Sequence, residues 1–356
     1  MAINFERLTG TTFIARGPTN LGLYAFGEND GAFAVAIDSG GDEDAGRRVA
    51  REAERLGLRL TALLNTHSNA DHCGGNAFLR RRTDCAIVAT EIEAAFLQHP
   101  KLEPSFLAGG YPQKAIRNKF LMAPPSRATY IIEPPCSLAL DENGAPRITA
   151  RGGLATEPGP DHLSIVPLPG HYFGMIGAMT PDRVFFVADA LAGAPIIEKY
   201  GVYFFYDLVA ELETLSMLER AEADWFVPSH AEPVRDIKPL VALNRDKIFE
   251  IADYIVKLAA EGKAGALDPL AGEALSGATS ETFGRDSPAE SAPGPATGAS
   301  LEDIVAGVCA RYNIALNADQ HVLVGSTVRS YLSWLCDQGR LEYGFERNRM
   351  IFRKPQ

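Results

Sequence analysis

The sequence predicts an α/β fold with one large domain and a small C-terminal unit. Short apolar runs bounded by turn residues alternate with amphipathic helical patterns over residues 1–260. Polar residues of the kinds that carry chemistry directly follow several of these runs. Over 261–300 the composition shifts to Gly, Ala, Ser, Pro, Glu and Thr, which is typical of a flexible linker between the large domain and residues 301–356.

Length and composition narrow the function classes. The chain has 356 residues, of which 46% are hydrophobic, enough for a full core in both parts. Its net charge of -11 disfavours nonspecific binding to nucleic acid or to an anionic membrane. The five cysteines form no disulfide framework. Because we find no signal-peptide pattern and no run long enough to span a bilayer, we expect a cytoplasmic protein without a membrane partner.

The secondary structure of the large domain is predicted from hydrophobic periodicity and turn residues. Strands are expected at 11–15, 21–26, 33–37, 60–64, 86–89, 163–168, 184–188 and 225–227. Helices are expected at 43–56, 76–82, 91–98, 207–220 and 236–260. Between 100 and 160, frequent Pro and Gly interrupt any pattern, and we interpret this stretch as a partly irregular insertion that forms a lid near the site.

The most informative stretch follows the predicted strand at 60–64. It places His67, Asn69, Asp71 and His72 on a loop at the carboxyl end of that strand, where ligand sites form in α/β layers. Alternate side chains of this loop can converge on one point, and His72 can turn to a second. Since zinc and related ions accept imidazole and carboxylate ligands, the spacing favours a metal site over isolated polar residues.

Three further residues lie directly at or after the end of a predicted strand: His171, Asp189 and His230. Taken singly, each has a structural explanation, because Asp189 can cap a helix and either histidine can be a hydrogen-bonded turn residue. Four strand ends that carry His or Asp in one chain indicate a shared site instead.

In this order and context, the residues resemble those of the metallo-β-lactamase superfamily over roughly residues 10–260. The resemblance implies a four-layer αββα sandwich with a metal site at one edge of its two sheets, as in glyoxalase II-like and β-lactamase-like hydrolases. It also implies one metal position formed by His67, residue 69 and His171, a second formed by Asp71, His72 and His230, and a bridging ligand, Asp189.

The sequence departs from the family pattern at Asn69, where the family usually has histidine. A carboxamide oxygen is a neutral and weaker donor to zinc than an imidazole nitrogen. We therefore expect one firmly bound Zn²⁺ at Asp71, His72 and His230, near Asp189, and partial occupancy of the other position. Iron or manganese is the alternative metal. A competing interpretation is that Asn69 only orients a neighbouring ligand.

The expected chemistry follows from the metal. A bound cation lowers the pKa of its water, so that a metal-activated water can attack a substrate at neutral pH, with Asp71 as a catalytic residue that orients the water or accepts its proton. We predict a hydrolase acting on a small ester, thioester or lactam. A ribonuclease or phosphodiesterase, a non-hydrolytic iron oxidoreductase and an inactive metal-binding scaffold remain as alternatives.

Three residues are predicted to contact the small-molecule substrate: Tyr172, Lys199 and Tyr203. Lys199 and Tyr203 belong to the aromatic segment 196–206, which lies between the Asp189 strand and a helix. Ordinary core packing explains the aromatic rings equally well. Lys199 is a candidate contact for an anionic substrate group.

The C-terminal unit is predicted to resemble a winged helix. Its expected helices are 301–312, 319–324 and 326–338, with Ser326 as an N-cap, and its expected strands are 341–345 and 350–353. Seven basic residues oppose six carboxylates over 301–356, so the unit lacks the basic surface of a nucleic-acid-binding domain. We favour a protein-contact module that packs on the neighbouring subunit of a homodimer and narrows the active site.

Overall fold

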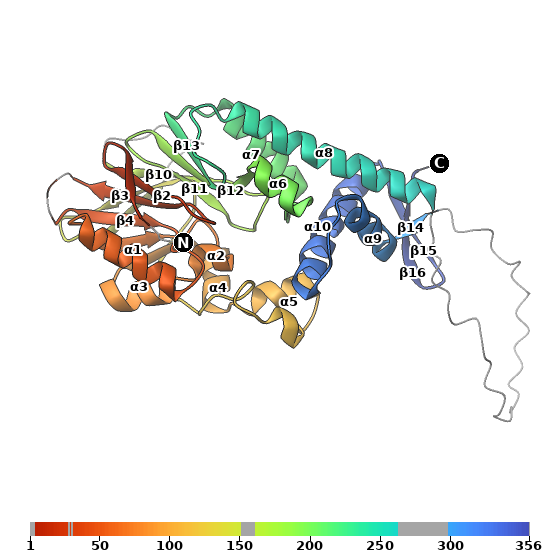
Figure 1. The fold of residues 1–356 in the computed structure, drawn as a ribbon, viewed down its shortest axis with the longest axis horizontal. Helices are drawn as coiled ribbons and strands as arrows, with labels where there is room; N and C mark the ends of the chain where they lie inside the picture. The colour runs from red at the N-terminus through yellow and green to blue at the C-terminus, as the bar shows by residue number, and fades with distance from the viewer. Residues whose placement is uncertain (1–3, 28, 30, 151–160, 263–297, 356) are drawn as a thin grey trace, which may run out of the picture.

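Two β-sheets pack face to face, and helices cover their outer faces (Figure 1). The computed structural model describes residues 4–27, 29, 31–150, 161–262 and 298–355. Most of the linker predicted at 261–300 lies outside these residues. The mixed α/β fold class is confirmed, and the layers are those expected of a metallo-β-lactamase sandwich.

The first sheet has the strand order β1-β2-β3-β4-β5-β6-β7. Its strands are β1 (Glu6–Thr9), β2 (Thr12–Ala15), β3 (Leu21–Phe26), β4 (Phe33–Ile37), β5 (Arg59–Leu64), β6 (Ala86–Thr90) and β7 (Tyr130–Ile132). Strands β1 to β4 are antiparallel, whereas β4 to β7 are parallel. The carboxyl ends of β4, β5 and β6 therefore lie at one edge of the sheet.

The second sheet has the order β13-β12-β11-β10-β8-β9. Its strands are β8 (Cys136–Leu140), β9 (Pro146–Ala150), β10 (Leu163–Pro167), β11 (Ile176–Met179), β12 (Val184–Ala192) and β13 (Trp225–His230). Only β12 and β13 pair in parallel among the described strands of this sheet.

Helices α1 (Glu43–Arg55), α3 (Asn76–Thr83) and α4 (Glu91–Gln98) cover the first sheet, and α7 (Leu208–Arg220) and α8 (Lys238–Glu261) cover the second. Shorter helices are α2 (Ala70–Cys73), α5 (Leu102–Ala108), η1 (Lys114–Ile116) and α6 (Ala194–Tyr200). Asp42 caps the N-terminus of α1 by accepting a hydrogen bond from one backbone N–H group, and Asp207 caps α7 by accepting from two.

The alternation of side chains along the strands divides the core into layers. In β5, Leu63 packs under α1 and α3, while Leu64 packs between the sheets. In β12, Phe185 packs under α7 and α8, while Phe186 packs between the sheets. Both faces of both sheets are therefore buried, which explains the nearly continuous apolar runs in the sequence.

The strands that carry Asp189 and His230 extend several residues beyond their predicted ends. The strand expected at 184–188 continues through Asp189 to Ala192, and the one expected at 225–227 continues to His230. Ala188 has a left-handed backbone (φ 51°), and the register between β12 and β13 shifts on either side of it. Such an irregularity re-aims a side chain without ending the strand. The sequence pattern could not distinguish it from a strand end.

The predicted irregular insertion at 100–160 is more regular than expected. It contains α5, η1, β7, β8 and β9, and it contributes one strand to the first sheet and two to the second. These strands were missed because they are short and pair with segments distant in sequence, which local periodicity does not report.

The C-terminal unit has two helices, not the three predicted. Helix α9 (Leu301–Arg311) is followed by a continuous α10 (Ala318–Asp337), so Ser326 lies inside a helix and is not an N-cap. Strands β15 (Glu342–Glu346) and β16 (Arg349–Arg353) form the expected hairpin, and the short β14 (Ala299–Ser300) pairs with β16. The winged-helix assignment therefore stays a prediction.

The C-terminal unit packs on the large domain of its own chain. Helix α8 runs from the sandwich to this unit, where α9 and α10 contact it (Figure 1). Helix α10 then runs away from α8 toward α5 and also contacts η1 and α7 (Figure 1). A small apolar cluster joins α10 to the insertion through Leu107, Ile116, Leu121 and Val322. Over the described residues, no helix combines the length and apolar character needed to cross a bilayer.

Candidate metal centre and cleft

The structure brings the predicted ligands together at one edge of the sandwich. His67 and Asn69 lie between β5 and α2, and Asp71 and His72 lie within α2. His171 follows β10, Asp189 lies within β12, and His230 ends β13. Two groups have all ligand atoms within 4.8 Å of one another: His67 with His72 and Asp189, and Asp71 with His72 and His230.

Asp189 lies at the middle of this cluster. Its Oδ1 is 3.1 Å from His72 Nε2, and its Oδ2 is 3.2 Å from His230 Nε2 and 3.6 Å from His171 Nε2. The Tyr203 hydroxyl donates a hydrogen bond to Oδ2 over 3.0 Å. Asp189 thus touches residues assigned to both metal positions, as a bridging ligand must.

Backbone and carboxylate acceptors fix the orientation of three histidine rings. Nδ1 of His171 donates to the Phe204 carbonyl over 2.9 Å, and Nδ1 of His230 donates to the Pro18 carbonyl over 2.7 Å. Nδ1 of His72 lies 2.8 Å from Asp38 Oδ2. Because each Nδ1 faces an acceptor, each Nε2 is left to face the centre, which is the usual arrangement of metal-ligating histidines.

His67 is oriented through Thr66. The Thr66 hydroxyl donates to Asp38 Oδ2 over 2.7 Å, so its oxygen is left to accept from His67 Nδ1 over 3.1 Å. His67 Nε2 therefore carries a lone pair, and this atom is buried without a hydrogen-bond partner. Asp38 therefore supports two of the four histidines, directly at His72 and through Thr66 at His67.

The surroundings shift the pKa values of the four histidines in two directions. Burial alone would lower the pKa values of His72 and His230. Nearby carboxylates, above all Asp189, outweigh burial and raise both pKa values well above the ordinary range. For His67 and His171 burial dominates and lowers the pKa, so these two rings stay neutral. Carboxylates thus dominate the surroundings of His72 and His230, whereas burial dominates those of His67 and His171.

Asp71 faces the cleft. Its side chain is 48% exposed, and its Oδ2 lies 3.3 Å from His230 Nε2 and accepts a hydrogen bond from the Thr19 hydroxyl over 2.8 Å. Burial alone would raise the pKa of Asp71, but His72 and His230 outweigh it and hold that pKa well below its usual range. The carboxylate is therefore ionised and accessible to a molecule in the cleft.

Asn69 lies beside the neutral histidines. Its Oδ1 is 3.2 Å from His171 Nε2, and its Nδ2 donates to Glu103 Oε1 over 2.9 Å. Glu103 lies on α5 and is buried. The carboxamide thus spans the gap between a buried carboxyl group and the centre.

These residues fit a divalent cation. The Nε2 atoms of His67 and His72 and Oδ1 of Asp189 are buried and have no hydrogen-bond partner in the structure. Leaving such atoms unpaired is costly unless a ligand satisfies them. The donor set consists of imidazole nitrogens, carboxylate oxygens and one carboxamide oxygen, which suits zinc and, by donor type, also iron or manganese.

A cleft of about 860 Å³ opens at Asp71 and His230. Its walls include Lys119, Phe120 and Leu121 of the insertion and Leu323 and Val324 of α10. The C-terminal unit of the same chain therefore forms part of the cleft.

The three predicted substrate contacts lie in different places. Lys199 and Tyr203 line the cleft. Tyr172 does not, because its side chain is 1% exposed and its ring packs among Phe96, Phe173 and the ligand His67. The structure places this ring outside the cleft lining, and the contact of Tyr172 with a substrate stays a prediction.

Sequence reasoning missed several residues that support the centre. Asp38 follows the strand at 33–37 directly, so the pattern that identified Asp189 could also have identified it. Glu93 accepts hydrogen bonds from the backbone N–H and the hydroxyl of Ser68, between His67 and Asn69. Glu93 and Glu103 carry no local signal, since each acts through a contact distant in sequence.

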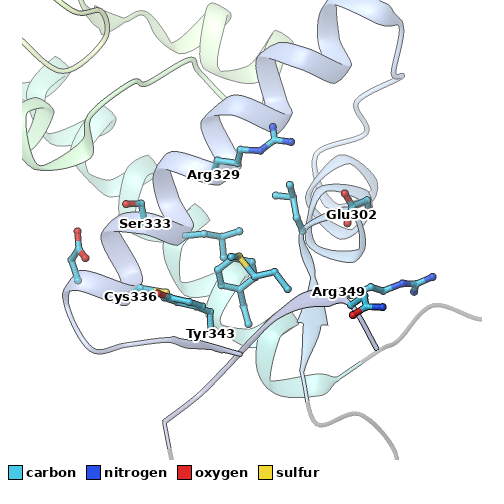
Figure 2. Close-up of a pocket in the computed structure, with 12 residues that line it drawn as sticks. Glu302, Arg329, Ser333, Cys336, Tyr343 and Arg349 are labelled. Carbon is cyan, nitrogen blue, oxygen red and sulfur yellow. The ribbon is translucent and has the colours of Figure 1, made fainter. Parts of the chain in front are cut away.

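A second cavity, of about 600 Å³, lies in the C-terminal unit between α9, α10 and the β15–β16 hairpin (Figure 2). Arg329, Ser333 and Cys336 of α10, Tyr343 of the hairpin and Glu302 of α9 line it. None of the predicted metal ligands or substrate contacts lines this cavity. The candidate site is therefore the cleft at Asp71 and His230.

Comparisons with known proteins agree with this geometry. Residues 15–230 match the family model of the Metallo-beta-lactamase superfamily. Over 79 residues the chain is 38% identical to a hydroxyacylglutathione hydrolase from Thiobacillus denitrificans, a match that covers 20% of this chain and only 29% of that protein.

Two solved structures match nearly the whole chain. A β-lactamase domain protein from Burkholderia ambifaria has a TM-score of 0.66 at 17% identity, covering 99% of this chain and 95% of its own. A metallo-beta-lactamase family protein from Thermus thermophilus has a TM-score of 0.62 at 16% identity, covering 98% of this chain and 100% of its own. At these identities the similarity concerns the fold alone.

Proposed function

The chain belongs to the metallo-β-lactamase superfamily, whose members are generally metal-dependent hydrolases, and we propose that it hydrolyses a small ester, thioester or lactam. One observation carries the proposal. Four histidines, each with its Nδ1 held by an acceptor, turn their Nε2 atoms toward Asp189 and Asp71 at the mouth of the cleft. This arrangement is costly to build without a cation to bind.

The two positions would bind a metal ion with different affinities. Asp71, His72 and His230, with Asp189 beside them, offer two carboxylates and two imidazoles, and we assign the firmly bound Zn²⁺ to this position. His67, His171 and Asn69 offer no carboxylate of their own, and Asn69 contributes a weaker donor. A divalent cation supplies two things when bound: a water of lowered pKa and polarisation of a substrate oxygen.

The remaining steps belong to residues of the chain. Asp71 is ionised and half exposed, so it can accept a hydrogen bond from the attacking water and orient it. The Thr19 hydroxyl holds Asp71 Oδ2 by a hydrogen bond and limits its rotation. Tyr203 donates to Asp189 and also lines the cleft, so its ring lies between the ligands and the substrate.

The residues that line the cleft suit a small organic substrate. Aromatic and aliphatic side chains such as Phe120, Tyr203 and Leu323 line it, and Lys119 and Lys199 add positive charge. Concave, largely apolar sites with a few polar groups are typical of small-molecule binding. The Thiobacillus relative is named as a hydrolase of hydroxyacylglutathione, in which an acyl group is joined to sulfur. We therefore place thioesters first among the substrates to be tested.

The test combines metal analysis with substrate panels. Protein purified without added metal is analysed by elemental mass spectrometry and assayed on thioester, ester and lactam panels, before and after chelation. We expect about one zinc per chain and hydrolysis that chelation abolishes and zinc restores. His230→Ala should lose activity by a factor of about 100 or more, whereas His99→Ala, at an exposed histidine outside the site, should not.

Three outcomes would overturn the proposal. Two irons per chain with turnover of oxygen or another redox substrate would identify an oxidoreductase. A fully metallated protein that hydrolyses none of the panels would identify a metal-binding scaffold. Cleavage of RNA or a phosphodiester, with the other panels inert, would replace the proposed substrate class.

A further inference from the structure

We propose that the cleft accepts a thioester whose thiol part carries a nucleoside diphosphate, and that two lysine–aromatic pairs, Lys119 with Phe120 and Lys199 with Tyr200, bind this nucleotide. The inference rests on the proposed function in one respect, namely that the chain hydrolyses thioesters. It goes further by naming the leaving group and the residues that recognise it. In the reaction, water adds to the acyl carbon and the C–S bond breaks, which yields a carboxylate, the nucleotide-bearing thiol and one proton.

The two pairs belong to separate segments that line the same cleft. Lys119 and Phe120 precede Leu121 of the insertion, and Lys199 and Tyr200 end α6. In each pair the lysine Nζ lies over the neighbouring ring, 5.4 Å from the Phe120 centroid and 4.6 Å from the Tyr200 centroid. Phe120 is 70% exposed and Tyr200 is 39% exposed. Both rings therefore keep surface that a molecule in the cleft can cover.

The first pair lies on a turn that is fixed at both ends. Asn118 Oδ1 accepts from the backbone N–H of Phe120 over 2.9 Å, and Asn118 Nδ2 donates to Asp319 Oδ1 over 2.8 Å at the start of α10. On the other side of the pair, Leu121 is buried against η1 and α10. Because the turn is already ordered, less conformational entropy is lost when a ligand binds to it.

The second pair is fixed by the end of α6. Lys199 Nζ donates to the Tyr200 hydroxyl over 3.0 Å. Gly201 then ends α6 with a left-handed backbone (φ 70°), and a Cβ at this glycine would clash with Tyr312 of the C-terminal unit. Phe204, a little further along, packs on the apolar cluster that joins α10 to the insertion. Both pairs are therefore attached to the same packed elements.

The two lysines carry charges without an ionic partner in the chain. Lys247 and Lys257 form ion pairs with glutamates at 3.0 and 3.7 Å. Among the described residues, no carboxylate forms such a pair with Lys119 or Lys199. A ligand with more than one negative charge can pair with both ammonium groups, and phosphate oxygens are strong acceptors for them.

The acidic residues of the cleft lining already have partners. Asp42 accepts a hydrogen bond from the backbone of α1, and Asp44 forms an ion pair with Arg47. Asp319 accepts hydrogen bonds from the insertion, and Asp71 belongs to the metal centre. The positive charges at the two lysine–aromatic pairs are therefore the ones left for a charged substrate group.

A nucleoside diphosphate matches this lining in two respects. Its phosphates carry at least two negative charges for the two ammonium groups, and its base offers a planar face that stacks on an aromatic ring. Glutathione, the thiol in the name of the Thiobacillus relative, has no aromatic ring to stack. An aromatic carboxylate in the acyl part of a substrate would supply a ring but only one charge. The lining thus favours a nucleotide on the thiol part.

The kinetic test compares thioesters that share one acyl group and differ in the thiol. The thiols are coenzyme A, which carries a nucleoside diphosphate, pantetheine, which is its thiol arm without the nucleotide, and glutathione. With the metal-loaded wild-type chain, we expect KM for the coenzyme A thioester to be about 10–100-fold lower than for the other two.

Variants test whether the two pairs cause this preference. Lys119→Ala, Lys199→Ala and Phe120→Ala should each reduce the KM ratio between the pantetheine and coenzyme A thioesters by about 3–10-fold. For the two lysines the reduction should be larger at low ionic strength, because salt screens exposed charges. Lys114→Ala is the matched control, since Lys114 is an exposed lysine of the same insertion outside the cleft lining, and it should keep the wild-type ratio.

Binding of ADP separates recognition from hydrolysis. Isothermal titration calorimetry with ADP compares the metal-loaded wild-type chain with the double variant Lys119→Ala/Lys199→Ala, in which every metal ligand is kept. We expect Kd for ADP to be at least about 10-fold weaker in the double variant. Thermal unfolding followed by circular dichroism shows that each variant is folded, as expected for exposed side chains.

Several outcomes overturn the inference and leave the hydrolase proposal standing. One is thioester hydrolysis with the same KM for all three thiols. Others are variants that keep the wild-type ratio, or equal Kd values for ADP in the wild type and the double variant. A carboxybenzoyl group on pantetheine that lowers KM more than the nucleotide does would assign the two pairs to the acyl part instead. Cleavage of esters or lactams but of no thioester would have the same consequence, whereas a chain that cleaves none of the substrates would overturn both proposals.

Discussion

Asp38 holds His72 through a 2.8 Å hydrogen bond between Oδ2 and Nδ1, at the end of β4 where the Asp38 backbone is left-handed (φ 61°). The same carboxylate accepts from the Thr66 backbone N–H over 2.8 Å and from the Thr66 hydroxyl over 2.7 Å. One buried side chain therefore joins β4 to the loop that carries the ligands, and it fixes the direction of two imidazoles.

We expect Asp38→Asn to weaken both folding and metal binding. Asparagine tolerates the left-handed backbone at this position. The main change is therefore that an NH₂ group replaces one carboxylate oxygen and faces a donor of Thr66 or His72. The unpaired donors should lower the free energy of unfolding by about 2 kcal/mol, and metal affinity should fall about 10–100-fold. Urea denaturation and zinc titration measure the two effects. An unchanged metal affinity would show that Asp38 supports the fold but not the ligands.

The buried Glu93 predicts a pH dependence of stability. Burial raises its pKa from 4.5 to about 7 in the folded protein, despite hydrogen bonds from Ser68 and Gly174. Between these two pH values the folded state keeps a proton that the unfolded state has released. Glu93 therefore contributes to the free energy of unfolding at low pH, and this contribution is lost as pH rises to 7. The total change is about 3 kcal/mol.

Glu93→Gln should remove this contribution. The free energy of unfolding is measured by urea denaturation at several pH values between 4.5 and 8. Between pH 4.5 and about 7, the value for the wild-type chain should fall relative to that of Glu93→Gln. Above about pH 7, the two curves should run parallel. Glu91→Gln, at an exposed position on the same helix, is the matched control and should follow the wild type. Parallel curves throughout would show that Glu93 has an ordinary pKa.

The sequence was sufficient to predict the strands that carry the ligands. The runs before His67 and His171 are buried on both faces, so they read as continuous apolar segments with polar residues at their ends. It could not predict β8 and β9, because their pairing depends on contacts distant in sequence. The hydrogen bond from Asn69 to Glu103 could not be predicted for the same reason, since the two residues are 34 positions apart.

The break predicted inside α10 shows how packing overrides local preference. Ser326 was predicted to be an N-cap, which placed a helix boundary just before it, at Gly325. A glycine inside a helix costs about 1 kcal/mol relative to alanine. Both residues are buried, and so are Thr327 and Val328 that follow. Apolar burial along this face outweighs the cost, and the helix continues.

Removing metal should destabilise the folded protein. A cation that binds the folded centre and not the unfolded chain stabilises the folded state by an amount that grows with its concentration, about 2.7 kcal/mol at 100 times Kd. We therefore expect a chelator to lower Tm by several degrees and zinc to restore it, as measured by scanning calorimetry. In His230→Ala the response to zinc should shrink, whereas in His99→Ala it should stay. Equal responses in both variants would place the bound zinc elsewhere.

Leu121 connects the insertion to the C-terminal unit, and its truncation should widen the cleft. The side chain is buried against Leu107, Ile116 and Val322, and next to it Asn118 Nδ2 donates to Asp319 at the start of α10. Leu121→Ala should lower the free energy of unfolding by about 2–3 kcal/mol through lost burial and a residual cavity. Because Leu121 and α10 form part of the cleft wall, KM for a cleaved substrate should rise, while kcat should change little since no ligand is touched.

The matched control for this prediction is Leu316→Ala, at a leucine that is 46% exposed just before α10. It removes the same atoms without disturbing the apolar cluster, so both stability and KM should stay near the wild-type values. A loss of stability in Leu121→Ala with KM unchanged would mean that the C-terminal unit stabilises the chain but does not shape the substrate site. A fall in kcat at constant KM would instead indicate that the packing of α10 reaches the ligands themselves.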